Sequence, residues 1–266
     1  ASFRLRERAL QSIYASVDAF IAPSHFLARR HIDWGLEAGR VAVIDNVTRV
    51  AAPHPSGPAS SRRNRFAFFG QLNPFKGVDL VLEAVISVPA EDWQGARLAI
   101  HGSGLERQPA PFRQRVQALL EAAGDRVDFR GPYPNTDVDQ LMAEADWIVM
   151  PSIWWENAPV VIQEAFRNHR PVIAANLGGM AEKVRDGVDG LLFKPRDAAS
   201  LGAALTAAQS PDLWSALTAE ITPPPAPADT ADQHLALYRA LRSRRSAEVA
   251  LPRRKTAPVA ESAIGA

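Results

Sequence analysis

The chain has 266 residues, 47% of them hydrophobic and 22% charged, a balance that is ordinary for a globular protein and excludes an intrinsically disordered one. The formal charge of +1 gives no net attraction to nucleic acid, so we expect no nucleic-acid partner. Cysteine is absent, which excludes disulfides and thiolate metal sites and favours a reducing, cytoplasmic location. No apolar run approaches the roughly 20 residues that would span a bilayer.

The N-terminal part predicts a strand, a helix and a second strand. The opening ASFRLRERAL has neither an initiator Met nor the apolar stretch of a signal peptide, so we interpret it as the cut edge of a longer chain. DAFIA predicts the first strand, Ser24 caps the helix, Gly39 ends it, and VAVI is the second strand. We assign residues 1–50 to this first unit and residues 51–64, rich in Pro, Ser, Gly and Arg, to a linker.

From Arg65 onward, short apolar runs alternate with helical patterns. The predicted strands are 65–70, 96–102, 126–131, 145–151, 170–175 and 190–194, and the predicted helices between and after them are 76–88, 109–124, 135–145, 158–168, 178–187 and 197–209. Such alternation predicts a parallel sheet built from right-handed crossovers, and near-continuous apolar strands indicate helices on both faces. We therefore predict an α/β fold with a doubly wound, Rossmann-like sheet over residues 65–210.

The alternation weakens after Gln209. TPPPAPAD interrupts the chain and TADQHLALYRALRSRR restores a helical period, so residues 211–246 are predicted to form a C-terminal helical segment. Residues 247–266 lack a usable period and are predicted to be disordered. We interpret the arginines near both chain ends as solvated helix faces, with weak association with an anionic membrane surface as the alternative. These residues are Arg4, Arg6, Arg8, Arg239, Arg242, Arg244 and Arg245.

The loops that follow the strands are the candidate binding loops, because ligands of open parallel sheets bind beyond the carboxyl ends of the strands. In FFGQLNPFKG, Gly70 ends a strand and Lys76 with Gly77 opens the next helix. A lysine beside free helix N–H groups suits a phosphate, whereas a merely solvated lysine would be disfavoured there by the helix dipole. We therefore predict that Lys76 binds phosphate.

Two further loops contain pairs of glycines. In IHGSGLE, Gly102 and Gly104 allow close approach of a ligand to the backbone, although the loop matches neither G-x-G-x-x-G nor a P-loop. His101 in the same stretch is predicted to be a packed strand residue. In ANLGGMAEKV, Gly178 and Gly179 lead into a helix and add a second feature that favours anions.

The stretch MPSIWWENAPVVIQEAF contains two carboxylates around an apolar helix. Glu156 lies before the helix, which Asn157 can cap, and Glu164 lies roughly 8–10 Å further along the axis. This spacing allows one carboxylate to take a sugar and the other a ribose, with phosphates between them. The alternative is that Glu156 only offsets the helix dipole and Glu164 is solvated. Trp154 and Trp155 form either a stacking platform for an acceptor or a buried pair.

These segments together resemble a known family. FFGQLNPFKGVDLVLEAV, HGSGLE, VDFRGPY and the run from ADWIVMPSIWWEN to GLLF follow, in order, the C-terminal half of family-4 glycosyltransferases. The resemblance covers roughly residues 66–208, and residues 17–46 resemble the end of the family's N-terminal domain. Residues 1–50 would then be a remnant of that domain. The Glu-x7-Glu motif, the strand-end KG and the trailing G-GLLF give the match its specificity.

The resemblance implies a GT-B fold whose C-terminal domain holds a nucleotide-sugar donor and needs no metal or other cofactor. It implies that Lys76 neutralises the donor diphosphate, that Glu156 contacts the sugar hydroxyls and that Glu164 holds the ribose hydroxyls. Glu156 and Lys76 would be the catalytic residues, because stabilising the departing diphosphate drives the transfer. The other implied donor-binding positions are Gly70, Gln71, Gly102, Gly104, Asn157, Ala158 and Val160.

Two positions depart from the family's pattern, and one domain is largely missing. Gln71 stands where many members have an arginine, and Pro159 replaces a usual glycine, which removes one N–H donor while Ala158 and Val160 can still donate. The family's N-terminal domain normally supplies the acceptor site, a Gly-rich loop and a catalytically important His. Only its last strand, helix and strand are present here, so we expect this chain alone to bind donor more readily than to transfer sugar.

The resulting expectation is a retaining glycosyltransferase of the hexosyltransferase type. It would act in bacterial surface polysaccharide or glycoconjugate synthesis, in the cytoplasm or at the inner face of the membrane, on a sugar or lipid-linked acceptor. The first alternative is a non-catalytic nucleotide-sugar binding module or truncated partner subunit. The second is a relative with other chemistry, such as a nucleotide-sugar epimerase, and the Glu-x7-Glu placement weighs against it.

Overall fold

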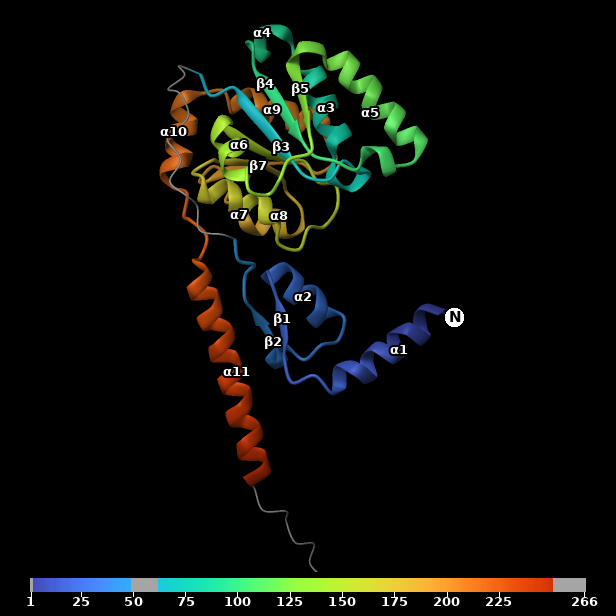
Figure 1. Ribbon diagram of the computed structural model, residues 1–266, viewed down its shortest axis with the longest axis vertical. Helices are drawn as coiled ribbons and strands as arrows, with labels where there is room; N and C mark the ends of the chain where they lie inside the picture. The colour runs from blue at the N-terminus through green and yellow to red at the C-terminus, as the bar shows by residue number, and fades with distance from the viewer. Residues whose placement is uncertain (1, 49–61, 251–266) are drawn as a thin grey trace, which may run out of the picture. The chain divides into compact units, whose positions relative to one another are not determined.

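A computed structural model describes residues 2–48 and 62–250 of the chain (Figure 1). Phe20–Thr230 forms one compact unit, and the two chain ends, Ala1–Ala19 and Ala231–Ala266, fall outside it. Most of the linker predicted at residues 51–64 and most of the tail predicted to be disordered at residues 247–266 lie outside the described residues.

The large sheet contains the six predicted strands, all parallel. They are β3 (Arg65–Phe69), β4 (Arg97–His101), β5 (Val127–Gly131), β6 (Trp147–Met150), β7 (Val172–Ala175) and β8 (Gly190–Phe193), in the spatial order β5-β4-β3-β6-β7-β8. The predicted doubly wound, Rossmann-like sheet is thus confirmed. Successive strands are added to one side of β3 as far as β5 and to its other side from β6 onward, so the strand order reverses between β3 and β6. In such sheets the ligand crevice lies at this switch point.

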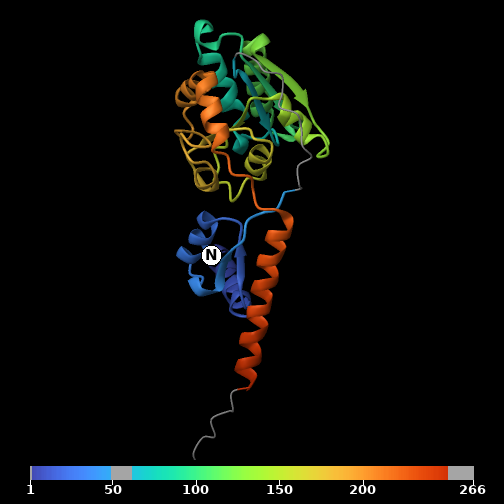
Figure 2. The ribbon, with the colours of Figure 1, turned by 90° about the vertical axis from the view of Figure 1, so that its left-hand side faces the viewer.

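Helices cover both faces of this sheet, as the two ribbon views show (Figures 1 and 2). They are α3 (Val78–Ser87), α5 (Ala110–Ala123), α6 (Val138–Glu144), α7 (Val160–Arg167), α8 (Gly178–Lys183) and α9 (Ala198–Ala207), with short α4 (Ala90–Trp93) after α3. Helix α3 packs against α5 and α9, and α6 packs against α7. Every residue of β6 and β7 is buried, which explains why these strands are continuous apolar runs rather than alternating ones.

The N-terminal part of the compact unit is a small βαβ element, which we call the βαβ unit (residues 20–46). Strand β1 (Phe20–Ala22) pairs in parallel with β2 (Val41–Val43), and α2 (His25–Asp33) connects them. Ser24 caps α2 as predicted, since its side chain accepts from the Leu27 N–H. The prediction that Gly39 ends this helix is wrong: α2 ends at Asp33 and is followed by Gly35 with φ +119°, whereas Gly39 lies in the short turn Ala38–Arg40.

The C-terminal segment contains two helices, α10 (Pro211–Ala219) and α11 (Pro227–Ala250). Helix α10 returns to the large sheet, where the Trp214 indole N–H donates to the carbonyl of buried Asp146 at 2.8 Å. Helix α11 extends four residues beyond the predicted boundary at residue 246. The arginines predicted on α11 and on α1 (Ser2–Ala15) are exposed. Within the described ranges, no helix combines the length and apolar character needed to cross a bilayer.

Candidate functional site

The loops after β3, β4 and β5 are joined by backbone hydrogen bonds at the carboxyl ends of the strands. The Gly70 N–H donates to the His101 carbonyl at 3.0 Å, and the Gly102 N–H donates to the Gly131 carbonyl at 2.8 Å. A Cβ atom on Gly102 would lie 2.0 Å from the Gly70 carbonyl oxygen, so only glycine allows the first two loops to meet this closely. These hydrogen bonds hold the three loops in a fixed arrangement at the carboxyl ends of the strands.

Lys76 and Glu156 meet at the switch point between β3 and β6. The Lys76 Nζ lies 2.8 Å from the Glu156 Oε1, and the side chains are 29% and 16% exposed, so the pair is accessible to a ligand. The Ser152 hydroxyl lies 2.8 Å from the same carboxylate oxygen and 2.8 Å from the Phe75 carbonyl oxygen. The structure therefore brings together a cation and a carboxylate that stand 80 positions apart in the sequence.

The backbone around Lys76 is held by two residues that sequence reasoning did not single out. The Asn73 side chain accepts from the N–H groups of Phe75 and Lys76 at 3.0 and 3.1 Å and caps the short helix Pro74–Lys76. Ser152 orients Glu156 from the other loop. Asn73 could have been found from the sequence, because an Asn that precedes a Pro is a turn signal, whereas nothing in the sequence marks Ser152. Gln71 is exposed, and its side-chain oxygen lies 3.4 Å from the Asn73 Nδ2.

Gly77 permits the contact between the two loops that supply Lys76 and Glu156. It has φ +71°, and a Cβ there would lie 2.0 Å from the Pro151 carbonyl oxygen. The β3 and β6 loops thus touch backbone to backbone directly behind the ion pair. The KG dipeptide has two separate physical roles here: the first residue provides charge, and the second provides the close approach.

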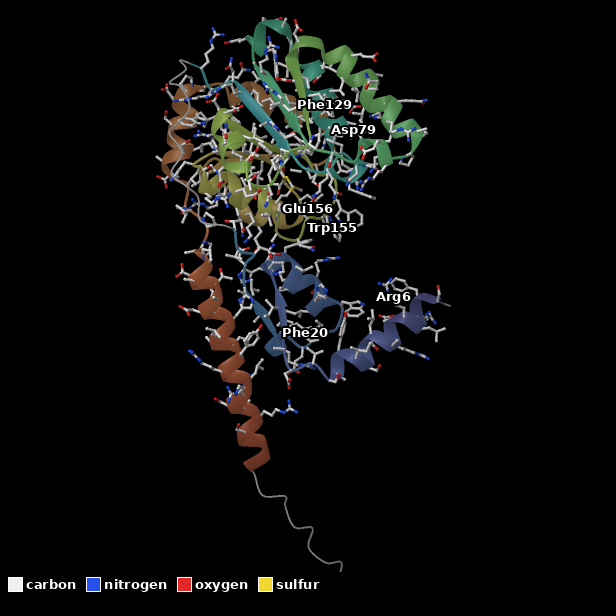
Figure 3. All side chains as sticks on the ribbon, viewed as in Figure 1. Arg6, Phe20, Asp79, Phe129, Trp155 and Glu156 are labelled. Carbon is white, nitrogen blue, oxygen red and sulfur yellow. The ribbon has the colours of Figure 1, made fainter. Side chains whose placement is uncertain are left out.

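The loop after β6 packs against α8 and differs in two ways from the sequence interpretation. Helix α7 starts at Val160 with Pro159 in the cap position and no side-chain cap, so the prediction that Asn157 caps this helix is wrong. The Gly179 N–H donates to the Glu156 carbonyl at 2.7 Å, and a Cβ on Gly179 would lie 2.1 Å from the Asn157 carbonyl oxygen. Gly179 therefore supports the loop, and its N–H is engaged rather than offered to an anion. Glu156 and its neighbour Trp155 are labelled on this loop in Figure 3.

Glu164 lies on α7 and is only 9% exposed, which contradicts the alternative that it is solvated. Burial raises the pKa of Tyr133, and the negative charge of Glu164 raises this pKa further. A cavity of about 990 Å³ opens beside the same strand ends and is lined by Leu72, Gly102, Ser103 and Pro132 together with side chains of α5. Glu164 lies on the helix after β6, and Lys76 and Glu156 lie in the loops after β3 and β6, so all three follow the carboxyl ends of strands in one parallel sheet.

The remaining predicted positions surround this arrangement. Gly104 has φ +95°, and its N–H donates to the Glu106 side chain at 3.1 Å. Ala158 is buried, and Val160 is 41% exposed at the start of α7. Among the described residues, no group of three His, Asp or Glu side chains is arranged to hold a metal ion.

The tryptophans at this loop are exposed, which contradicts the alternative that they form a buried pair. Trp154 is 58% exposed and Trp155 is 49% exposed. Trp154 lies edge-on to Phe75 with ring centroids 5.3 Å apart, and Trp155 lies edge-on to Phe26 of α2 at 6.0 Å. Two exposed aromatic side chains therefore lie on the same loop as Glu156.

His101 is buried at the end of β4, as predicted, and stacks on Phe69 at a centroid distance of 4.7 Å. Its pKa is lowered chiefly by burial and also by Arg130, while Asp128 opposes the shift. As the pH is lowered through about 6.5, the His101 imidazole takes up a proton in the unfolded chain before it does so in the folded protein. The free energy of unfolding should therefore decrease as the pH is lowered below about 6.5.

Denaturant unfolding at pH 7 and at lower pH tests this linkage. We expect His101→Phe, which retains the stacked ring, to lose less stability on acidification than the wild type. Wild-type and variant stabilities that decline in parallel would show that His101 does not contribute to the pH dependence.

The strand order and this polar site at the switch point define the class: a Rossmann-like domain, with the site formed by the β3 and β6 loops. The chain belongs to the family described as Glycosyl transferases group 1, whose sequence profile matches residues 63–210, more than half of the chain. Among curated relatives, a D-inositol 3-phosphate glycosyltransferase of Nocardia farcinica is 29% identical over 221 residues, covering 76% of this chain and 47% of the relative. The corresponding Mycobacterium marinum enzyme is 34% identical over 143 residues, covering 52% and 29%.

Solved structures share the fold. HepE from Anabaena, in complex with UDP and glucose, superposes with a TM-score of 0.72 at 21% identity, covering 90% of this chain and 68% of HepE. Sucrose-phosphate synthase from Thermosynechococcus elongatus superposes with a TM-score of 0.71 at 24% identity, covering 90% and 62%. The expected GT-B type of Rossmann fold is confirmed by these likenesses. The chain spans about half the length or less of the curated relatives it matches.

Proposed function

We propose that the compact unit binds a nucleotide-sugar donor and that the whole protein transfers the sugar to an acceptor with retention of configuration. It would act as a family-4 enzyme of the hexosyltransferase type in bacterial surface polysaccharide or glycoconjugate synthesis. The observation that carries this proposal is the contact of 2.8 Å between Lys76 and Glu156 at the switch point. A cation and a carboxylate side by side suit a ligand that presents a diphosphate next to sugar hydroxyls.

Each site residue has a distinct part in this proposal. Lys76 neutralises the diphosphate in the bound donor and stabilises the charge that develops as the diphosphate departs. Glu156 accepts hydrogen bonds from the sugar hydroxyls, and Glu164, buried on α7, accepts from the ribose. Backbone N–H groups at Asn157, Ala158 and Val160 and the N-terminus of α7 add positive potential near the phosphates.

The other predicted donor contacts are backbone surfaces. Gly70, Gln71, Gly102 and Gly104 lie at or after the ends of β3 and β4, and Gly102 lines the cavity of about 990 Å³, which gives room for a nucleoside. We propose that no metal or other cofactor takes part, because Lys76 and the loop N–H groups supply the positive charge. UDP or UDP-glucose is bound in solved structures of HepE, which shares this fold and supports a nucleotide-sugar donor. The location that we propose is the cytoplasm or the inner face of its membrane.

A second candidate function is a nucleotide-sugar binding module or partner subunit without catalysis. Gln71 favours it, because many family members have an arginine there and this residue instead lies against Asn73 in its own loop. Both candidates require donor binding, so they differ only in transfer. If the protein is a transferase, the bond between C1 of the sugar and the diphosphate oxygen should break at a measurable rate. If it is a non-catalytic binding module, this bond should stay intact.

Binding calorimetry tests the part that both candidates share. We expect the chain to bind at least one of uridine, guanosine and adenosine diphosphate, and to bind a matching nucleotide sugar more tightly than the nucleoside monophosphate. A chain that binds none of these ligands would contradict the proposal. Release or transfer of the sugar from the nucleotide sugar by the whole protein, followed by chromatography, then separates the two candidates.

Glu164→Gln tests the ribose contact. Replacing the carboxylate should weaken binding of the preferred nucleoside diphosphate about tenfold, since a hydrogen bond to a charged group is worth about 1.5–3 kcal/mol. The wild type should discriminate against the 2′,3′-dideoxy nucleotide, whereas the variant should bind both forms nearly equally. The substitution should also lower the pKa of Tyr133, which absorbance titration follows. Undiminished discrimination in the variant would remove Glu164 from the ribose site.

A further inference from the structure

Three successive carbonyl groups in the loop after β6 each accept one hydrogen bond from outside the loop. The Glu156 carbonyl accepts from the Gly179 N–H at 2.7 Å, and the Asn157 carbonyl accepts from the Ser24 hydroxyl at 2.6 Å. The Ala158 carbonyl accepts from the Asn46 Nδ2 at 3.1 Å. One donor comes from α8 and two come from the βαβ unit, so this loop is held from outside by segments far away in the sequence.

These bonds fix the direction of the loop's N–H groups. A trans peptide sets its C=O and N–H on opposite sides. Because the carbonyls of Glu156 and Asn157 face α8 and α2, the N–H groups of Asn157 and Ala158 face the other way. In the part of the chain that the structure describes, neither N–H has a hydrogen-bond partner. The next peptide has its carbonyl held by Asn46, but its nitrogen belongs to Pro159 and carries no hydrogen.

Ser24 is an integral part of the contact between the start of α2 and the loop after β6. Its side chain is almost fully buried, at 1% exposure, and its single hydroxyl has two partners. The oxygen accepts from the Leu27 N–H at 3.1 Å, which caps α2, and the hydrogen is donated to the Asn157 carbonyl. The hydroxyl therefore links the start of α2 directly to the Glu156 loop.

The carboxylate of Glu182 on α8 completes the junction. It accepts from the backbone N–H groups of His25 and Phe26, the first two residues of α2. With Ser24 capping Leu27, the first three N–H groups of α2 are thus satisfied at this contact. Lys183 forms an ion pair with Asp45 in the same junction but touches none of the three loop carbonyls.

We infer that Ser24 and Asn46 are positioning residues for the donor site. Ser24 orients the peptide between Asn157 and Ala158, so that the Ala158 N–H is preset toward the donor phosphates, and Asn46 holds the next peptide and so keeps the loop in place. This inference rests on the proposed function for the identity of the ligand. It assigns the βαβ unit a role in donor binding, although none of its residues is predicted to touch the donor. Presetting matters because a loop that is already ordered loses less conformational entropy on binding.

Four variants of the chain test the inference. Ser24→Ala removes the hydroxyl, and Asn46→Asp replaces the amide donor with an oxygen of nearly the same shape that cannot donate to the Ala158 carbonyl. Ser24→Thr restores the hydroxyl. Lys183→Met is the matched control, because it breaks an ion pair of the same junction without touching the loop carbonyls. The dissociation constants of uridine, guanosine and adenosine diphosphate are measured by calorimetry, and amide hydrogen exchange is followed over residues 155–160 by mass spectrometry.

We expect Ser24→Ala and Asn46→Asp each to weaken diphosphate binding about five- to tenfold, the scale of one lost hydrogen bond. Both should also speed amide exchange over residues 155–160, while Ser24→Thr and Lys183→Met stay within about twofold of the wild type. Unchanged binding and exchange in both test variants would overturn the inference. An equal loss in Lys183→Met would also overturn it, because the junction as a whole would then be responsible. If the wild type binds none of the three diphosphates, the proposed function fails, and the exchange rates still decide whether Ser24 and Asn46 order the loop.

Discussion

Replacing Lys76 by alanine is expected to abolish the rise in melting temperature that a nucleoside diphosphate gives the wild-type chain. The lysine supplies the full positive charge 2.8 Å from Glu156, and a charged hydrogen bond is worth about 1.5–3 kcal/mol, or about ten- to hundredfold in the dissociation constant. Thermal unfolding with increasing ligand, backed by calorimetry, measures the loss. The free chain itself should lose little stability, because the ion pair is partly exposed.

Two other variants make this result specific. Lys194 is a matched control: its side chain is 78% exposed and pairs with Asp197 on the surface, so Lys194→Ala should leave the ligand-induced shift unchanged. Glu156→Gln should weaken binding of the nucleotide sugar, because a contact to the sugar hydroxyls is changed. It should leave binding of the nucleoside diphosphate unchanged or make it tighter, because Lys76 then no longer pairs with a carboxylate of the protein. A Lys76 variant that retains the full shift would remove the phosphate assignment.

Gly77→Ala is expected to have the largest effect on stability among the single substitutions considered. The left-handed φ of +71° costs an alanine about 1–2 kcal/mol, and its Cβ would in addition lie 2.0 Å from the Pro151 carbonyl oxygen. That oxygen belongs to backbone and cannot rotate away, so the β6 loop itself must move. We expect a loss of at least about 3 kcal/mol in the free energy of unfolding, measured in urea, within the range of large single-site effects.

Gly187 provides the matched comparison for this substitution. It has φ +70°, nearly that of Gly77, but a Cβ there would meet nothing within 4 Å. Gly187→Ala should therefore show only the conformational cost of about 1–2 kcal/mol. Similar losses in the two variants would mean that the contact between Gly77 and Pro151 does not constrain the loops. Any Gly77→Ala protein that folds should also bind diphosphate poorly, because the displaced loop contains the Asn157 and Ala158 N–H groups that we propose to lie near the phosphates.

The predictions for Lys76 and Gly77 concern neighbouring residues whose roles differ in how far the sequence reveals them. The charge at Lys76 is visible in the sequence, as is the position of a glycine after it. The reason for that glycine is visible only in the structure, where the Pro151 backbone occupies the space of a side chain. The same holds at Gly179, whose missing side chain admits the Asn157 carbonyl. Sequence reasoning took Gly179 as a feature for anions, because it could not know what would lie against it.

Local sequence patterns predicted correctly those features that depend on hydrophobic periodicity and on the order of elements along the chain. Alternating apolar runs and helical segments predicted all six strands of the large sheet, and the position of a loop after its strand placed Lys76 and Glu156 at one edge. Local patterns failed for the start of α7, where Asn157 was expected to cap, and for the end of α2, where Gly35 rather than Gly39 follows the helix. Local patterns also left open whether Trp154 is exposed or buried, since burial depends on which other segments reach the loop.

The sequence by itself determined the layer architecture and the residue types at the strand ends, because hydrophobic period and loop order act over a few residues at a time. Only the tertiary structure decided which of those residues meet. The ion pair joins positions 80 apart, and the bond from Ser24 to the Asn157 carbonyl joins positions 133 apart. Such contacts depend on how closely loop backbones approach one another, and that distance is fixed by packing of the whole unit rather than by any local pattern.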